Sequence, residues 1–279
     1  MTQPMPALFL GHGSPMTAIS DVPERRAWQA LGRALPRPRA VLAVTAHWET
    51  QGRIHLTAGE CPRTIHDFRG FPDELYAIRY PAPGSPELVE RVIGLLGDDR
   101  AVADPNWGFD HGAWGVVQPM FPDADIPVVA MSLDRSLPPE AHLALGAALA
   151  PLRDEGVLLV SSGNIVHNLA LWRQSAGTIP EWAATFRDRS NAAILAGDHA
   201  ALLHFEPGDR AAEYAINSGE HFLPLLYTLG ARRPGDGVGL FNDTIDGALS
   251  MTSVLVGDTS LLDGAAASAV ALAEPRQGG

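Results

Sequence analysis

The stretch Phe9-Leu-Gly-His-Gly-Ser-Pro15 closes a short apolar run, Ala7–Leu10, with a turn that places His12 between two glycines. The run predicts a buried strand. The glycines let the backbone turn tightly and leave room around the imidazole ring. Imidazole is both the commonest metal ligand and the commonest acid–base group near neutral pH. The stretch therefore predicts a strand whose end presents His12 to a functional site, with a buried structural histidine as the alternative.

The same arrangement, an apolar run followed by a polar turn, recurs along the chain. Between the runs, apolar residues at helical spacing indicate helices, and proline opens three of them, as is common in a first helical turn. This alternation predicts helices packed on a mixed, largely parallel sheet, in which ligands gather at the carboxyl ends of the strands. The predicted strands are Ala7–Leu10, Ala40–Thr45, Ile126–Met131, Val157–Val160 and Leu249–Val256, and the predicted helices are Pro86–Leu96, Pro138–Arg153, Pro180–Ala196 and His221–Leu229.

Two further histidines follow predicted strands. His47 lies in Ala43-Val-Thr-Ala-His-Trp-Glu49, and His167 lies in Ser161-Ser-Gly-Asn-Ile-Val-His-Asn168. Because the carboxyl ends of parallel strands share one edge of a sheet, we expect both side chains to converge with His12. Taken alone, each histidine is equally compatible with a structural role.

Two more histidines lie in polar turns beside glycine. His221, in Ser218-Gly-Glu-His-Phe-Leu-Pro224, stands at an expected helix start next to Glu220, a position typical of a helix cap. His111, in Gly108-Phe-Asp-His-Gly-Ala-Trp114, could pack on a nearby tryptophan. The aromatic loop Ile65-His-Asp-Phe-Arg-Gly-Phe71 makes His66 a candidate for lining a pocket. Several histidines at the ends of strands and helices together predict a metal-centred active site.

The composition is that of an ordinary globular protein. The chain has 279 residues, of which 46% are hydrophobic and 19% charged, and this length suits one large domain. We expect a single catalytic domain over residues 1–262, followed by a tail, 263–279, that frays because it is Ala-rich and then polar. The formal net charge of −12 argues against a nucleic-acid partner, which would require basic patches.

Two residue types exclude several kinds of chemistry. Cys61 is the sole cysteine, so an internal disulfide and a cysteine-based metal cage are excluded. The chain has no lysine, which excludes a lysine Schiff base and a phosphate-binding P-loop. No apolar run approaches the roughly 20 residues of a membrane helix, and no signal-peptide pattern is present. We therefore expect a cytoplasmic protein without membrane association.

Motifs of other enzyme classes are absent or weak. The sequence has no Gly-x-Ser-x-Gly elbow and no His-Glu-x-x-His metal motif. Gly235-Asp-Gly-Val-Gly239 has the wrong spacing for a nucleotide-binding turn and is predicted to be a loop. Asp123 and Asp125 follow Pro122 in a pattern typical of a solvated turn, not of a glycosidase carboxylate pair.

Taken together and in this order, the motifs are specific. The chain resembles the class III extradiol ring-cleavage dioxygenases, in particular the DOPA-4,5-dioxygenase-like branch, from about Pro6 to Gly257. The resemblance rests on Gly11-His-Gly-Ser-Pro15, Ala46-His-Trp48, Ile65-His-Asp-Phe-Arg-Gly-Phe-Pro72 with Tyr76, Tyr80-Pro-Ala-Pro-Gly84, Asp110-His-Gly-Ala-Trp114, Ser162-Gly-Asn-Ile-Val-His-Asn168 and Glu220-His-Phe-Leu-Pro-Leu225.

The resemblance implies a three-layer α/β/α sandwich and a role for each matching position. It makes His12, His47 and His221 the ligands of one divalent metal. His167 matches the acid–base histidine of the family, and His111 matches a pocket histidine near substrate and oxygen. The substrate contacts expected in the matching motifs are Ser14, Trp48 and His66.

Glu220 raises a separate question, because relatives of the protocatechuate type complete the metal site with a carboxylate. Here the matching position is His221. Adjacent helical residues point about 100° apart, so only one of the two side chains should bind the metal. Glu220 is then expected to orient a histidine from outside the ligand set by accepting its free N–H.

The implied activity is opening of a catechol ring with O2 to give a semialdehyde. Fe(II) is the metal expected for activity, and Zn(II) is expected in purified protein because it binds nitrogen sites more tightly. The expected partners are a small aromatic diol and O2. A zinc hydrolase remains an alternative, since three histidines and a water also form a catalytic zinc site. A non-catalytic metal-binding protein of the same fold is the other alternative.

Overall fold

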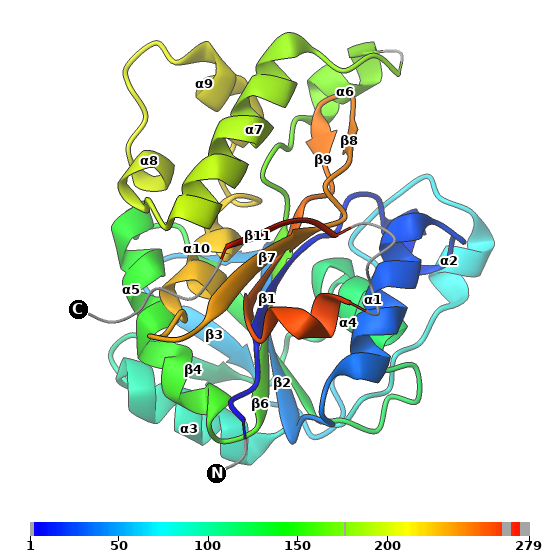
Figure 1. Cartoon of the computed structure of the whole chain (residues 1–279). Helices are drawn as coiled ribbons and strands as arrows, with labels where there is room; N and C mark the ends of the chain where they lie inside the picture. Colours follow the sequence, from blue (N-terminus) through cyan, green and yellow to red (C-terminus); the bar gives the residue numbers. More distant parts are fainter. Residues whose placement is uncertain (1–2, 176, 264–268, 274–279) are drawn as a thin grey trace.

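The computed structural model describes residues 3–175, 177–263 and 269–273 of the chain (Figure 1). Within these residues, nine strands form one mixed sheet in the order β11-β7-β10-β1-β6-β2-β5-β3-β4. Their bounds are β1 Ala7–Gly11, β2 Ala40–Thr50, β3 Ile54–Thr57, β4 Ala101–Asp104, β5 Val128–Asp134, β6 Val157–Gly163, β7 Gly237–Phe241, β10 Ser253–Gly257 and β11 Ala269–Ala273. A separate hairpin consists of β8 Ile245–Asp246 and β9 Leu249–Ser250.

The centre of the sheet consists of four parallel neighbours, β1, β6, β2 and β5. Every residue of β1, β5 and β6 is buried, because layers cover both faces, and this explains their nearly unbroken apolar runs. Successive side chains alternate between the faces. Phe9 belongs to the core on one side of the sheet, while Leu8 and Leu10 belong to the core on the other.

Helices cover both faces of the sheet (Figure 1). On one face, α1 (Pro23–Ala34) packs against α4 (His111–Met120), and Trp28 and Trp114 are fully buried there. On the other face, α10 (Leu223–Gly230) packs against α5 (Pro139–Leu149) and β6, and α5 also contacts α3 (Pro86–Leu96). The predicted three-layer α/β/α fold with a mixed central sheet is therefore confirmed.

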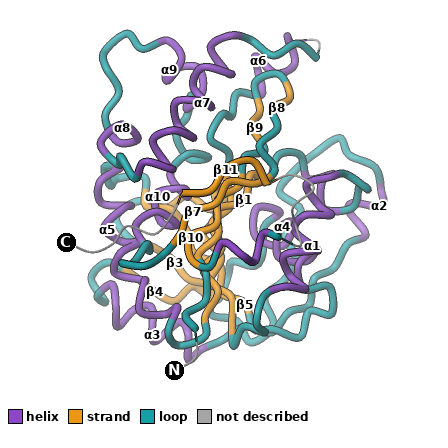
Figure 2. Tube along the Cα trace, in the orientation of Figure 1, coloured by secondary structure: helices purple, strands orange, loops and turns teal. Residues whose placement is uncertain are grey.

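The remaining helical segments include a group beyond the carboxyl ends of β1 and β6. Helices α6, α7 and α9 and the β8–β9 hairpin lie together at that end of the molecule (Figures 1 and 2). Within the described part of the chain, no helix is both long and apolar enough to cross a membrane. The bounds not yet given are α2 Asp73–Ala77, α6 Leu169–Ser175, α7 Glu181–Ala196, α8 Ala200–Leu203, α9 Arg210–Ile216 and the 3-10 turns Pro15–Ala18, Ala150–Arg153 and Thr259–Leu262.

Local sequence signals set the start of α3, which coincides with the predicted helix. Pro86 occupies its first turn, and the Ser85 hydroxyl accepts a hydrogen bond from the backbone N–H of Leu88. Gly97 follows the last turn with a φ of 98°, a conformation that glycine adopts without strain. The chain therefore enters and leaves this helix as the sequence predicts.

Three predictions about the second half of the chain are wrong in detail. The run Leu249–Val256 is not one strand, since it divides into β9 and β10. The predicted loop at Gly235–Gly239 contains the start of β7, which is buried between β10 and β11. In the tail expected to fray, Ala269–Ala273 instead pairs with β7, because that strand would otherwise have an open edge. The other tail residues, 264–268 and 274–279, lie outside the described residues.

Candidate active site

The end of β6 brings two of the candidate histidines to the same edge of the sheet. The backbone N–H of His12 donates to the carbonyl of Gly163, and the N–H of Asn164 donates to the carbonyl of His221. A Cβ atom at Gly163 would lie 2.2 Å from the His221 carbonyl oxygen. Only glycine allows this approach, so Gly163 fixes the distance between the His221 loop and the sheet.

His47 projects from an irregular part of β2. The pairing of β2 with β5 breaks after Val44↔Met131 and resumes at Glu49↔Leu133, so β2 holds extra residues between these pairs. Such bulges bend a strand and redirect its side chains, and they are frequent next to active sites. This irregularity turns His47 towards His12 at the carboxyl edge of the sheet.

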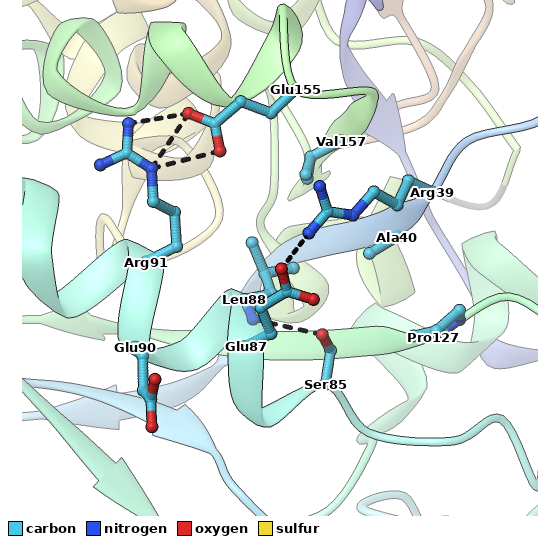
Figure 3. A pocket seen from close by; sticks show the side chains of 10 residues that line it. All are labelled: Arg39, Ala40, Ser85, Glu87, Leu88, Glu90, Arg91, Pro127, Glu155 and Val157. Atoms are coloured by element: carbon cyan, nitrogen blue, oxygen red, sulfur yellow. Dashed lines mark hydrogen bonds and ion pairs between the residues drawn. The ribbon is translucent and has the colours of Figure 1, made fainter.

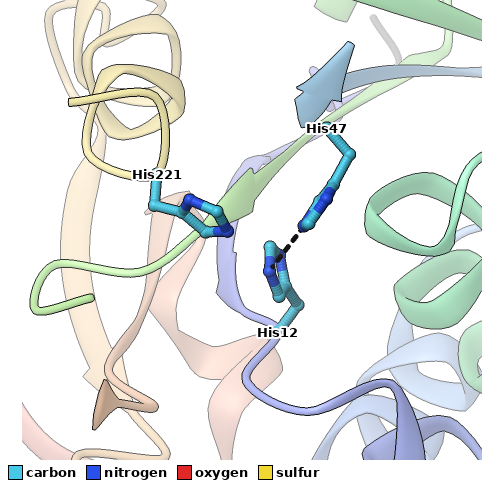
Figure 4. A group of neighbouring side chains, drawn as sticks. All are labelled: His12, His47 and His221. Carbon is cyan, nitrogen blue, oxygen red and sulfur yellow. Dashed lines mark hydrogen bonds between the residues drawn. The ribbon is translucent and has the colours of Figure 1, made fainter. Parts of the chain in front are cut away.

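The three imidazoles of His12, His47 and His221 face one another (Figure 4). Their ring centroids lie 5.0 to 5.1 Å apart. Nε2 of His12 is 3.2 Å from Nε2 of His47, and one nitrogen from each ring lies within 4.8 Å of the others. Nε2 of His221 is buried without a hydrogen-bond partner. Three ring nitrogens that converge without a protein acceptor at their centre have the geometry of a metal-binding group.

The opposite nitrogen of each ring is held by a neighbour. Nδ1 of His12 forms a hydrogen bond with the Ser162 hydroxyl at 2.9 Å, and Nδ1 of His221 donates to the Glu220 carboxylate at 2.9 Å. Nδ1 of His47 lies 3.1 Å from the Asp67 carboxylate. A proton on Nδ1 leaves the Nε2 lone pair free, which is the tautomer that a metal requires. The donor set therefore fits a divalent metal.

The protonation tendencies of the three rings differ. Burial lowers the pKa of His12 and His221 well below the usual value, and repulsion from neighbouring histidines adds to this effect. Burial also acts on His47, but its hydrogen bond to Asp67 and the charges of Asp110 and Asp67 outweigh burial and raise its pKa. His12 and His221 are thus neutral at pH 7, as ligands must be.

Asp67 is a functional candidate that the sequence did not single out. Its Oδ2 lies 2.9 Å from Nδ1 of His111, and its Oδ1 accepts the backbone N–H of His111 at 2.8 Å. The same Oδ2 also contacts His47. The hydrogen bonds from His111 and His47 hold the pKa of this carboxyl far below its usual range although burial opposes them. One ionised carboxylate therefore connects a candidate ligand to His111.

His167 lies against the same group of rings. Its imidazole is stacked on that of His221, with 3.4 Å between centroids and 6° between planes. The backbone of His167 is fixed by a hydrogen bond to the Ala215 carbonyl and by a bridge to Leu249. Burial lowers the pKa of its ring to about 4, so the ring is neutral at pH 7. The neutral ring can accept a proton.

The predicted ligands and acid–base candidates line one cavity of about 570 Å³ together with Ser14. Its walls are mainly aromatic and aliphatic, and several lining residues were not predicted from the sequence. The lining residues are His12, Gly13, Ser14, Pro15, His47, Asp67, Phe68, Arg69, Phe71, His111, His167, Leu169, Trp172, Arg173, His221 and Leu249.

Trp48 and His66 were expected to contact the substrate, but neither side chain lines the cavity. Trp48 follows His47 along β2, so its side chain points away, where it stacks on Trp107 at 5.2 Å. His66 precedes Asp67 and likewise points out of the cavity. Its Nε2 contacts the carbonyl of Ile78 at 3.1 Å. In each case the adjacent residue, His47 or Asp67, faces the cavity instead.

Comparisons with known proteins agree with this site. A family model described as the catalytic LigB subunit of aromatic ring-opening dioxygenase matches residues 6–238. The chain belongs to this family. A protein of Escherichia coli (strain K12) named 4,5-DOPA dioxygenase extradiol is 46% identical over 261 residues, which cover 91% of this chain and 95% of that protein. A protein of Beta vulgaris with the same name is 36% identical over 247 residues, covering 86% and 92%.

A solved structure shows the same architecture. The crystal structure of an uncharacterized Escherichia coli K12 protein has a TM-score of 0.74 and 40% sequence identity, and covers 91% of this chain and 100% of that chain. The resemblance to the DOPA-dioxygenase-like branch, inferred from motifs, is therefore confirmed. The LigB family model spans all of the candidate site residues from His12 to Glu220 and His221.

Proposed function

We propose that the protein is a metal-dependent extradiol dioxygenase that opens a catechol ring with O2 to give a semialdehyde. The observation that carries the proposal is the convergence of three Nε2 atoms, each opposite a held Nδ1, at the floor of an aromatic cavity. Family membership and the names of the relatives support a catechol of the DOPA type as substrate. We assign the catalytic unit to residues 1–262.

His12, His47 and His221 would hold one divalent metal, with Fe(II) as the active species and Zn(II) as a competitor for the nitrogen ligands. When bound, the metal supplies a Lewis acid for the catechol oxygens and a path for electrons from the ring to O2. Glu220 keeps His221 in the binding tautomer. Its carboxylate is occupied by the His221 N–H and by the Ser218 hydroxyl at 2.7 Å, which supports a role outside the ligand set.

His167 takes a proton from a catechol hydroxyl in this proposal. Its ring is neutral at pH 7 and lies beside the ligand His221, so a diol bound at the three histidines comes within its reach. The proton is returned to the ring-opened product. The carbon–carbon bond beside the diol breaks, one oxygen atom of O2 enters a carboxylate, and the other enters the aldehyde.

His111 and the apolar walls orient the reactants. The N–H at Nδ1 of His111 is directed at Asp67, which leaves its Nε2 as an acceptor for a substrate hydroxyl. Phe68, Phe71 and Leu249 provide apolar walls for an aromatic ring and limit access of water. These residues position the diol and the proton acceptor in one geometry, which is the main contribution a protein can make here.

The proposal is tested by loading the protein with Fe(II) under anaerobic conditions and adding oxygenated catechols. We expect oxygen uptake and a yellow ring-opened product from a subset of the catechols. The matched monophenols should give neither, because they lack the second coordinating oxygen. Oxygen-independent hydrolysis of esters or amides by the zinc form would support the hydrolase alternative. Metal binding without turnover of any compound would support a binding protein.

A further inference from the structure

One arginine, Arg135, contacts two of the segments that carry the candidate metal ligands. It directly follows β5, outside the candidate active-site cavity. Its Nε lies 3.1 Å from a carboxylate oxygen of Glu49, which lies two residues after His47 on β2. Its Nη2 donates to the carbonyl of Ser218 at 2.5 Å, in the turn that leads to His221. The guanidinium of Arg135 therefore joins β2 to this turn.

The third nitrogen of the guanidinium, Nη1, faces Glu220. It is buried, and it has no hydrogen-bond partner among the described residues. Oε2 of Glu220 lies 3.7 Å from it, within ion-pair distance. Oε1 of the same carboxylate accepts hydrogen bonds from the Ser218 hydroxyl at 2.7 Å and from Nδ1 of His221 at 2.9 Å. Arg135 thus attracts the oxygen of Glu220 that His221 does not use.

These contacts restrict the orientation of the Glu220 carboxylate. The nitrogens of a guanidinium lie in one rigid plane, so the groups that bind them are fixed relative to one another. The side chain of Arg135 is 29% exposed and that of Glu220 is 14% exposed, so solvent screens their attraction less than that of a surface pair. If Glu220 turned away, Nη1 would stay buried without an acceptor, which is costly for a charged group.

Two arginines at the opposite edge of the sheet have simpler contacts (Figure 3). They line a cavity of about 630 Å³ at the amino ends of β2 and β6. There Arg39 forms an ion pair with Glu87, and Arg91 forms one with Glu155. Their side chains are more exposed than those of Arg135 and Glu220, and exposed pairs contribute little. Arg39, which directly precedes β2, is therefore a matched comparison for Arg135.

We propose that Arg135 is a positioning residue of the metal site, which holds Glu220 where it accepts the Nδ1 proton of His221. Nε2 of His221 then stays free for the metal. Through Glu49 and the Ser218 carbonyl, Arg135 also fixes the turn of His221 relative to β2. The inference rests on the metal site of the proposed function.

A positioning role and a purely electrostatic role predict effects of opposite sign. The charge of Arg135 offsets part of the negative charge of Glu49 and Glu220. Removal of that charge alone would make the surroundings of the site more negative and would favour a bound cation. Loss of positioning would instead weaken metal binding, because His221 would lose its fixed ring orientation and tautomer.

The first test measures the Zn(II) dissociation constant by competition with a chromophoric chelator. Arg135→Gln should raise this constant by about 3- to 10-fold, less than loss of a direct partner of a ligand, because Arg135 is one contact further from the metal. Arg135→Lys keeps the charge but not the planar fork, so it should lose nearly as much affinity. Arg39→Gln, which breaks a surface ion pair, should leave the constant unchanged. Tighter binding by Arg135→Gln, or full affinity in Arg135→Lys, would overturn the inference.

A double-variant cycle separates positioning from a general loss of structure. If Arg135 acts through Glu220, Arg135→Gln should have little further effect on the Zn(II) dissociation constant in a Glu220→Gln background. Losses that multiply in the double variant would assign Arg135 a role independent of Glu220 and would overturn the inference.

Turnover assays distinguish this inference from the proposed function. If Arg135→Gln binds Zn(II) more weakly while the Fe(II)-loaded unchanged protein opens no catechol, the positioning role stands and the proposed activity fails. If catechols are opened but Arg135→Gln binds Zn(II) as tightly as the unchanged protein, the activity stands and the inference fails.

Discussion

Replacement of Asp67 by asparagine should weaken metal binding although Asp67 lies outside the proposed ligand set of His12, His47 and His221. Its Oδ1 faces the backbone N–H of His111 at 2.8 Å, and its Oδ2 faces Nδ1 of both His111 and His47 at 2.9 and 3.1 Å. A backbone N–H cannot become an acceptor, so the amide oxygen of the substituted side chain must stay at the Oδ1 position. The amide NH2 then faces Nδ1 of His47 and favours the tautomer with the proton on Nε2.

In that tautomer the proton on Nε2 of His47 blocks the nitrogen that would bind the metal together with His12 and His221. Loss of an outer partner of this kind raises the metal dissociation constant by about 10- to 100-fold, or about 1.4 to 2.7 kcal/mol. Competition of the protein with a chromophoric chelator for Zn(II) measures this constant without any turnover. Asp104→Asn is the matched control, because Asp104 contacts His55 Nδ1 at 3.0 Å in the same way but outside the cavity. A folded Asp67→Asn protein with the affinity of the unchanged protein would refute the reasoning.

Three further predictions concern other histidines and a neighbouring glutamate. His167→Ala should keep the metal and lower turnover by roughly 10²- to 10⁴-fold, as expected for loss of a general base. Metal loss in that variant would make His167 a fourth ligand. Glu220→Gln should retain the metal with a modest loss of activity, whereas His221→Gln should lose it, and the reverse result would mean that the carboxylate is the ligand. Burial lowers the pKa of His142 to about 4 from 6.5, so its contribution to stability is complete above pH 6.5 and is lost as the pH falls towards 4. The variant His142→Asn can keep the hydrogen bond to the Tyr227 hydroxyl but lacks the titrating ring. When the pH falls from 7 to 5, its free energy of unfolding, measured with denaturant, should therefore decrease by about 2 kcal/mol less than that of the unchanged protein. Parallel pH profiles of the two proteins would contradict this.

From the sequence alone, we could predict the location of those site residues that directly follow a strand. His12 and His167 follow apolar runs that are β1 and β6, and parallel strands in one sheet must end at a common edge. A histidine just past such a run is therefore predicted to lie at the carboxyl edge of the sheet. His221 was placed by its motif alone, and the contact of its carbonyl with Asn164 explains its location.

The residues that the sequence missed or misplaced depend on contacts between distant segments. Asp67 acts through His111, which lies 44 residues further along the chain, and no local pattern reports such a pairing. Trp48 was misassigned because the alternation of side chains along β2 places it opposite His47. β7 was missed because its glycine-rich start resembles a loop, and its pairing with β10 and β11 decides its conformation.

The central claim is that this chain uses its three-histidine site to insert both atoms of O2 into a catechol. The most direct test is a single turnover of Fe(II)-loaded protein with a catechol under ¹⁸O2, followed by mass spectrometry of the trapped product. The account predicts a ring-opened semialdehyde that carries two ¹⁸O atoms and one O2 consumed per catechol. A product without label from O2, or a quinone formed while the ring stays closed, would contradict it.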